Sequence, residues 1–138
     1  MLARGFDEFF GALDRSDIRF LVIDQVPTLA PYNHSCLSQT GLILRRPCPV
    51  TMMKTATTAS EERVLAVIRD LPSRWPHVSV LLPRDLMCND EGCPTTLNGE
   101  FLYRDTTHLR RNLKAETTAQ LVNLLHLPEM LAHAAMFP

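Results

Sequence analysis

The sequence lacks an excess of charge of either sign. Its 14 Lys and Arg residues stand against 15 Asp and Glu residues, which leaves a formal net charge of −1. Nucleic acids and anionic membranes attract cationic surfaces, so this balance gives no electrostatic case for either partner. Long hydrophobic runs are also missing. The apolar run Phe20–Ile23 is far shorter than the ~20 residues that a membrane-spanning helix needs.

The sequence also shows no signal-peptide pattern and no internal repeat. The first residues include two acids, Asp7 and Glu8, and no apolar segment of the kind that export signals carry, so we expect no signal peptide in this chain. What remains is 138 residues with 46% hydrophobic content, which predicts one domain spanning residues 1–138.

The four cysteines fall into two local pairs, Cys36 with Cys48 and Cys88 with Cys93. Two loop-closing disulfides, and therefore an oxidising compartment, are the favoured interpretation. A four-thiolate zinc site is a second interpretation. The spacing of Cys88 and Cys93 suits it, whereas the wider spacing of Cys36 and Cys48 does not. Four buried free thiols are a third.

Hydrophobic periodicity and proline positions predict an α/β chain. Strand, helix and strand follow one another in its first half, an order that builds a parallel strand pair. Between the first strand and that helix, residues 26–49 contain four prolines and predict a long surface segment. The expected elements are a helix over 4–15, a buried strand over 18–24, a helix from Ser60–Glu62 to Pro72, and a buried strand over 77–82.

The second half is less regular. Residues 84–111 are predicted to be irregular with a turn at Asn98–Gly99, and residues 112–127 to form a helix ended by Pro128. The last ten residues form either a short helix or a frayed tail. Two strands leave both edges of a sheet open, so the sequence predicts either further strands or a part of a larger fold. Open edges also predict self-association.

Two groups of polar residues are candidates for chemistry. Asp105 precedes His108 by three residues, so its carboxylate can accept the imidazole Nδ1–H and leave Nε2 as a general base for a hydroxyl nucleophile. The alternative is that Asp105 caps the following helix and His108 lies on its first turn. Asp24 ends the first expected strand, where parallel sheets bind ligands, and a simple loop cap is the alternative.

The segment around Asp105 and His108 resembles the C-terminal end of the SGNH hydrolase-like domain that is fused to, or accompanies, membrane-bound acyltransferases of the type 3 family. Members of this family end with a cysteine pair, a Gly-x-x-Leu-Tyr-x-Asp-x-x-His-Leu stretch and a final helix. The resemblance also includes Val22–Pro27, Tyr32–Asn33 and the first cysteine pair, and it spans roughly residues 8–127. The residues that match the C-terminal pattern are Cys88, Cys93, Gly99, Leu102, Tyr103, Asp105, His108 and Leu109.

This resemblance implies a partial three-layer α/β/α sandwich, flavodoxin-like, with a mainly parallel sheet. It implies transfer or hydrolysis of O-acyl groups on cell-envelope glycans such as lipopolysaccharide, in the periplasm or another extracytoplasmic space. His108 and Asp105 would be the base and orienting acid of a Ser-His-Asp triad, with Tyr103 near the pocket. Two disulfides, Cys36–Cys48 and Cys88–Cys93, are implied. The implied partners are a glycan acceptor, an acyl donor and a membrane acyltransferase, with no cofactor and no metal.

One family element is missing from the sequence. The family's nucleophile lies in a Gly-Asp-Ser block, and no Gly-Asp-Ser occurs in these 138 residues. A triad without its serine cannot form an acyl-enzyme, so we expect the serine to come from a missing N-terminal half or a partner chain. We expect little or no esterase activity from this chain alone. The alternative is a catalytically inactive, disulfide-stapled binding module on the same scaffold.

Overall fold

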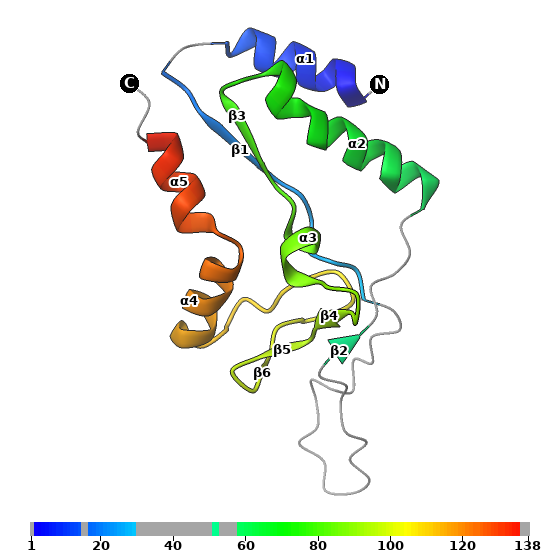
Figure 1. Ribbon diagram of the computed structural model, residues 1–138, viewed down its shortest axis with the longest axis vertical. Helices are drawn as coiled ribbons and strands as arrows, with labels where there is room; N and C mark the ends of the chain where they lie inside the picture. Colours follow the sequence, from blue (N-terminus) through cyan, green and yellow to red (C-terminus); the bar gives the residue numbers. More distant parts are fainter. Residues whose placement is uncertain (1, 15–16, 30–50, 53–57, 136–138) are drawn as a thin grey trace, which may run out of the picture. The chain divides into compact units, whose positions relative to one another are not determined.

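The structure is a computed structural model of the chain, and it describes residues 2–14, 17–29, 51–52 and 58–135. These residues form helices and small sheets, which confirms the expected α/β class. They fall into two compact units (Figure 1). Unit 1 comprises Met1–Asp24, Ala56–Leu81 and Pro128–Pro138, and unit 2 comprises Gln25–Thr55 and Leu82–Leu127. No helix among the described residues is both long enough and apolar enough to cross a bilayer.

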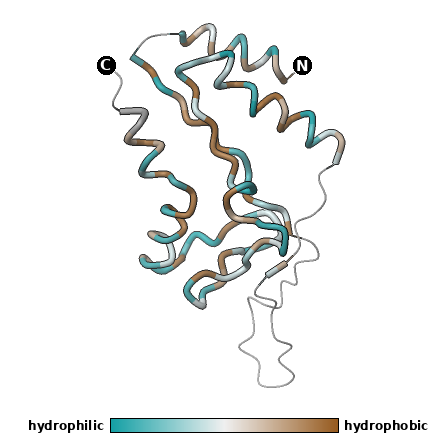
Figure 2. The backbone as a smooth tube through the Cα atoms, viewed as in Figure 1, coloured by the Kyte–Doolittle hydropathy of each residue, from teal (hydrophilic) through white to brown (hydrophobic). Residues whose placement is uncertain are grey.

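The sheet of unit 1 is a parallel pair of strands. Strand β1 (Phe20–Ile23) lies beside β3 (Val78–Leu81), in a register that runs from Phe20 opposite Val78 to Ile23 opposite Leu81. Figure 2 shows both strands as hydrophobic over most of their length. The parallel pairing is confirmed, but the expectation that β1 is covered on both faces is wrong. Ile23 is 55% exposed and the other three residues of β1 are only partly buried.

Helix α2 (Ala59–Arg74) precedes β3 and begins with a capping box. The Thr58 hydroxyl accepts the N–H of Glu61 at 3.3 Å, and the Glu61 carboxylate accepts the N–H of Thr58 at 2.6 Å. The start of this helix therefore agrees with the early acids in the sequence. Its buried stripe is Leu65, Ile68 and Leu71.

The predicted end of this helix at Pro72 is wrong. Pro72 lies inside α2, and the helix continues to Arg74. A proline in a helix removes its own N–H bond to the fourth residue back, and its ring crowds the carbonyl of that residue. The next turn can still close, and it does: the N–H of Trp75 donates to the carbonyl of Leu71 at 2.8 Å.

Helix α1 (Leu2–Ala12) supplies the aromatic part of the core of unit 1. Phe10 is only 2% exposed and belongs to a buried cluster with Leu71 and Val78. Its ring lies edge-on to Phe20 of β1, with 5.2 Å between the ring centroids. Trp75 packs against the same cluster, so α1, α2 and both strands share one core.

Unit 2 contains short elements where the sequence predicted an irregular segment, so that prediction is wrong. Helix α3 (Pro83–Met87) starts directly at Pro83, and β2 (Thr51–Met52) pairs antiparallel with β4 (Cys93–Pro94). Strands β5 (Thr96–Leu97) and β6 (Glu100–Phe101) form a hairpin. Strands of two residues carry no readable periodicity, which is why the pattern missed them.

The turn of that hairpin is the predicted Asn98–Gly99 turn. Both residues have positive φ, 53° and 70°, as a two-residue hairpin loop of this kind requires. Leu102 follows the hairpin and is fully buried, and its N–H donates to the carbonyl of Thr95 at 2.8 Å.

The C-terminal helices differ from the expected single helix over 112–127. Helix α4 (Ala115–Leu124) starts later, and helix α5 (Leu127–Ala135) follows it closely, which confirms a short final helix. His126 separates the two because its φ of 52° is left-handed and cannot continue a helix. Pro128 lies in the first turn of α5, where a missing N–H is tolerated.

The expected surface segment over 26–49 is described only as far as Leu29. Pro27 and Leu29 are fully buried, and the N–H of Leu29 donates to the carbonyl of Thr106 at 3.0 Å. The expectation of surface exposure is therefore wrong for the start of this segment. Residues 30–50 lie outside the described residues.

Candidate active-site loop

Asp105 and His108 lie on a tight, hydrogen-bonded backbone turn in unit 2. The N–H of Arg110 donates to the carbonyl of Leu102 at 2.8 Å, and the N–H of Arg104 donates to the carbonyl of His108 at 2.8 Å. Between these two bonds, Tyr103 and Leu109 form an antiparallel bridge. The chain therefore turns sharply over residues 105–107 and returns, which brings positions 105 and 108 together.

The side chain of Asp105 holds this turn. Its Oδ1 accepts the backbone N–H of Thr107 at 3.0 Å and that of His108 at 2.9 Å. Such local bonds from an aspartate to the next N–H groups are typical of Asx turns. The helix-cap alternative is wrong, since α4 begins only at Ala115. Glu100, not Asp105, accepts the N–H of Lys114, the residue before that start, at 3.0 Å.

The imidazole of His108 faces the same carboxylate. Its Nδ1 lies 2.8 Å from Oδ1 and 3.0 Å from Oδ2 of Asp105. The His108 side chain is 62% exposed and that of Asp105 is 25% exposed. Nδ1 can donate to the carboxylate, in which case Nε2, on the far side of the ring, carries the free lone pair. The arrangement can therefore accept a proton from a hydroxyl group that approaches Nε2.

Two further side chains, which the sequence pattern did not predict to have a role, complete the network. The Thr107 hydroxyl lies 3.0 Å from Nδ1 of His108 and donates to Oδ1 of Asp105 at 3.2 Å. The guanidinium of Arg104 donates through Nε and Nη2 to Oδ2 of Asp105, both at 3.2 Å. The signal that could have found Thr107 is its place two residues after an aspartate, where Asx turns form.

These contacts keep Asp105 ionised. The pKa of its carboxyl is held well below the usual range, chiefly because the carboxylate accepts the backbone N–H of Thr107. Desolvation acts in the opposite direction, and hydrogen bonds from the side chains of His108, Arg104 and Thr107 add to the lowering. A negative charge therefore stays beside Nδ1, where it can stabilise an imidazolium.

The remaining two candidates are Tyr103 in unit 2 and Asp24 in unit 1. Tyr103 is fully buried, and that burial raises the pKa of its phenol above the ordinary value, so the group stays neutral. It supports the loop from the core side. Asp24 directly follows β1 in unit 1, and its N–H donates to the carbonyl of Leu81 at 3.0 Å.

The cysteines of the second pair form a disulfide. Cys88 and Cys93 are joined at an S–S distance of 2.08 Å, and Asn89 and Gly92 between them are bonded to each other in both directions. Both thiols of this pair are therefore unavailable as zinc ligands. Among the residues that the structure describes, no group of three or more His, Cys, Asp or Glu could hold a metal ion. Cys36 and Cys48, like Ser35 and Ser38, lie outside those residues.

Comparison with known proteins identifies the family. No curated protein and no solved structure matches the chain. One protein family does match, over residues 2–113, and it is described as the SGNH domain fused to AT3 domains. The match takes in both units, from α1 to the loop of Asp105 and His108. The chain therefore belongs to the family of SGNH domains fused to AT3 domains, the hydrolase-like domains associated with acyltransferases.

Proposed function

We propose that this chain is part of an SGNH-type acyl-transfer domain that acts on O-acyl groups of cell-envelope glycans, such as lipopolysaccharide. Asp105 is the orienting acid and His108 is the general base. The observation that carries the proposal is the pair of short distances, 2.8 and 3.0 Å, from Nδ1 of His108 to a carboxylate that stays ionised. An exposed ring with its Nδ1 held in this way is prepared for proton transfer at Nε2.

The chemistry is a two-step displacement. Nε2 of His108 takes the proton of a serine hydroxyl as the serine oxygen attacks the acyl carbonyl of the donor. The imidazolium then returns this proton to the leaving oxygen, which gives an acyl-serine. An acceptor hydroxyl repeats the two steps on the acyl-serine and takes the acyl group, which restores the serine. Water in place of the acceptor would make the same reaction a hydrolysis.

The serine comes from outside residues 1–138 in this proposal. The sequence contains no Gly-Asp-Ser block. Thr107 carries a hydroxyl group close to His108, but this hydroxyl contacts Oδ1 of Asp105 and Nδ1 of His108, and not Nε2, where a nucleophile is needed. The 138 residues then form the part of a single SGNH-like domain that follows the nucleophile. Its complete form is a three-layer α/β/α sandwich, of which β1, α2 and β3 make one parallel unit.

The compartment and the partner follow from the same proposal. A disulfide between Cys88 and Cys93 suits an oxidising space such as the periplasm. Fusion of this family to AT3 domains makes a membrane acyltransferase the natural partner and the source of acyl groups. A glycan hydroxyl is the acceptor, and no cofactor takes part.

The test supplies the missing serine. The full chain is fused to the Gly-Asp-Ser-bearing N-terminal segment of another member of the family, and hydrolysis of a chromogenic acetyl ester is measured. We expect background rates from the chain alone and turnover from the fusion. His108→Gln should lower the turnover of the fusion by about 100-fold or more, as loss of a general base does. Arg111→Gln, at an exposed position nearby, is the matched control and should retain it.

Three outcomes would contradict the proposal. Equal turnover with and without His108 would remove its role as base. His108-dependent turnover by the unfused chain would place a nucleophile inside these residues, and Ser35 and Ser38 would then be tested first. Background rates in every fusion, with the ring of His108 still held by Asp105 in nitrogen NMR spectra, would favour the inactive binding module.

A further inference from the structure

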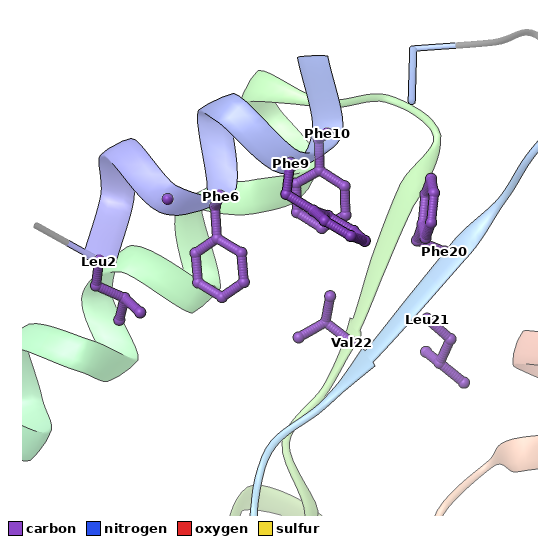
Figure 3. Close-up of a pocket in the computed structure, with 8 residues that line it drawn as sticks. Leu2, Phe6, Phe9, Phe10, Phe20, Leu21 and Val22 are labelled. Carbon is purple, nitrogen blue, oxygen red and sulfur yellow. The ribbon is translucent and has the colours of Figure 1, made fainter. Parts of the chain in front are cut away.

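The groove along α1 and β1 in unit 1 is lined by apolar side chains, among them Phe6 and Phe9 (Figure 3). Its volume is about 900 Å³, but apolar side chains cannot transfer a proton or orient a polar group. The network around Asp105 in unit 2 contains a carboxylate, an imidazole, a hydroxyl and a guanidinium within hydrogen-bonding distance. Two members of this network, Arg104 and Thr107, stand outside the acid–base pair, and their contacts point to a role in it.

The carboxylate of Asp105 is held from two sides. Its Oδ1 accepts the backbone N–H groups of Thr107 and His108, and the Thr107 hydroxyl donates to the same oxygen at 3.2 Å. Its Oδ2 accepts the N–H groups at Nε and Nη2 of Arg104, both at 3.2 Å. Rotation of the carboxylate would break one of these two sets of bonds. Arg104 and Thr107 therefore fix the orientation in which both oxygens face Nδ1 of His108.

Arg104 lies directly opposite His108 in the backbone pairing of the loop. Its N–H donates to the carbonyl of His108 at 2.8 Å, next to the bridge between Tyr103 and Leu109. Since side chains alternate between the two faces of paired segments, Arg104 and His108 share one face. The Arg104 side chain is 51% exposed, and exposed ion pairs contribute little to folding. Loss of its guanidinium should therefore disturb the carboxylate more than the fold.

The hydroxyl of Thr107 affects which nitrogen of His108 carries the ring proton. It has a single proton to donate, and it lies 3.0 Å from Nδ1 and 3.2 Å from Oδ1 of Asp105. When this proton is donated to Oδ1, the hydroxyl oxygen accepts from Nδ1–H, and Nε2 keeps its lone pair. When it is donated to Nδ1, Nε2 carries the ring proton and cannot act as a base. An ionised carboxylate is the stronger acceptor, which favours the first arrangement.

We propose that Arg104 and Thr107 are positioning residues for His108. Arg104 fixes Oδ2 of Asp105, Thr107 directs its proton to Oδ1, and together they hold the imidazole as the tautomer that is protonated at Nδ1. Both act on the imidazole and the carboxylate beside it rather than on a substrate. This inference rests on the proposed role of His108 as general base, because that role requires a free lone pair on Nε2.

The same loop contains a matched control for each of the two residues. Thr106 directly precedes Thr107, and among the described residues its hydrogen bond is made by the backbone carbonyl, to the N–H of Leu29. Its side chain can therefore be changed without loss of a contact to the carboxylate or the imidazole. Arg111 is exposed, and alternation along the chain places it on the face opposite to that of His108.

The first test uses the full chain without any added segment and determines the tautomer of the neutral His108 ring by ¹⁵N NMR. We expect the wild-type ring to be protonated at Nδ1. Thr107→Val keeps the shape of the side chain without its hydroxyl. This variant and Arg104→Gln should each raise the ratio of the Nε2-protonated to the Nδ1-protonated form by about fivefold, the change that one lost hydrogen bond produces. Thr107→Ser, Thr106→Val and Arg111→Gln should keep the wild-type spectrum.

The second test measures turnover of the chromogenic acetyl ester by the fusion with the Gly-Asp-Ser-bearing segment. Thr107→Val and Arg104→Gln should each lower kcat by about tenfold, as loss of the group that orients a functional histidine does at metal sites. KM should stay unchanged, because neither side chain binds the ester. Thr107→Ser should recover most of kcat, and both control variants should keep the wild-type kcat and KM.

The two tests separate this inference from the proposed function. If the fusion shows no turnover that depends on His108, the proposed function fails, whereas the NMR comparison still decides whether Arg104 and Thr107 set the tautomer. Tautomer ratios in Thr107→Val and Arg104→Gln that equal those of their controls would overturn the inference. So would a raised KM with unchanged kcat, which would mean that these side chains bind substrate instead of positioning His108.

Discussion

At the scale of the residue, the single carboxylate of Asp105 both closes the turn over residues 105–108 and orients the imidazole of His108. Its Oδ1 accepts the backbone N–H groups that close the turn, and both carboxylate oxygens face Nδ1 of His108. The same contacts that fold the loop therefore orient the proposed base. Any substitution at this position changes the turn and the imidazole together unless it keeps the Oδ1 acceptor, as asparagine does.

The ionisation of Asp105 gives a pH prediction. The pKa in the folded chain lies below that in the unfolded chain, so ionised Asp105 adds stability that is fully present above the ordinary pKa of about 3.9. That stability is lost as the pH falls through the folded value. In a ¹³C NMR titration we expect the Asp105 carboxyl carbon to keep the chemical shift of the ionised form as the pH falls through the ordinary pKa of aspartate. A midpoint at or above about 3.9 would contradict the prediction.

Sequence spacing could predict part of this network but not all of it. A separation of three positions between a carboxylate and an imidazole allows contact, and the contact between Asp105 and His108 is present. The bonds of Thr107 and Arg104 depend on backbone angles within the turn, which spacing does not determine. The helix-cap alternative failed for a related reason. The sequence does not show that α4 starts ten residues after Asp105.

At the scale of the element, α2 shows how local capping and the core act on the same helix. The capping box of Thr58 and Glu61 satisfies N–H groups at its start, while Leu65, Ile68 and Leu71 are buried along one side. Thr58 is exposed, so its hydroxyl contributes through the cap and not through packing.

Removal of this cap gives a stability prediction. We expect Thr58→Ala to lower the free energy of unfolding by about 1 kcal/mol, because the N–H of Glu61 loses its acceptor. Thr58→Ser keeps the hydroxyl and should stay within a few tenths of the wild-type value. Denaturant unfolding of the three proteins, followed by circular dichroism, measures the difference. Equal stability of the alanine and serine variants would show that the cap contributes nothing.

Long elements could be predicted from the sequence, and their ends could not. The helices of α1 and α2 and the strands β1 and β3 were expected, because their apolar residues recur with a clear period. The sequence predicts a helix end at both Pro72 and Pro128, yet in the structure Pro72 lies near the end of α2 and Pro128 at the start of α5. A proline restricts a helix without fixing on which side of it the helix lies.

At the scale of the whole molecule, the described chain forms two compact units with little sheet in either. The core of unit 1 contains Phe10, Leu71 and Val78, whereas Leu102 and Tyr103 are among the fully buried residues of unit 2. Unit 2 is built from two-residue strands and short helices, and it contains the disulfide. Small units of this kind often depend on a cross-link, because they bury too little apolar surface.

Reduction of the Cys88–Cys93 disulfide should therefore weaken the molecule. A disulfide between cysteines five residues apart lowers the conformational entropy of the unfolded chain, which stabilises the folded state by about 2 kcal/mol. The effect should reach β2, because Cys93 is fully buried and lies opposite Met52 in the β2–β4 pair. Gly92, which precedes Cys93, also packs closely on β2 and has no room for a side chain, since an added Cβ would lie 2.7 Å from the Met52 carbonyl oxygen.

The measurement is made in a Cys36→Ser, Cys48→Ser background, so that reductant can act only on Cys88 and Cys93. We expect reductant to lower the free energy of unfolding of this protein by about 2 kcal/mol. A variant with all four cysteines replaced by serine should start at that lower value and should not respond to reductant. If reductant leaves the first protein unchanged, the disulfide does not stabilise unit 2, and the structural argument for an oxidising compartment loses its support.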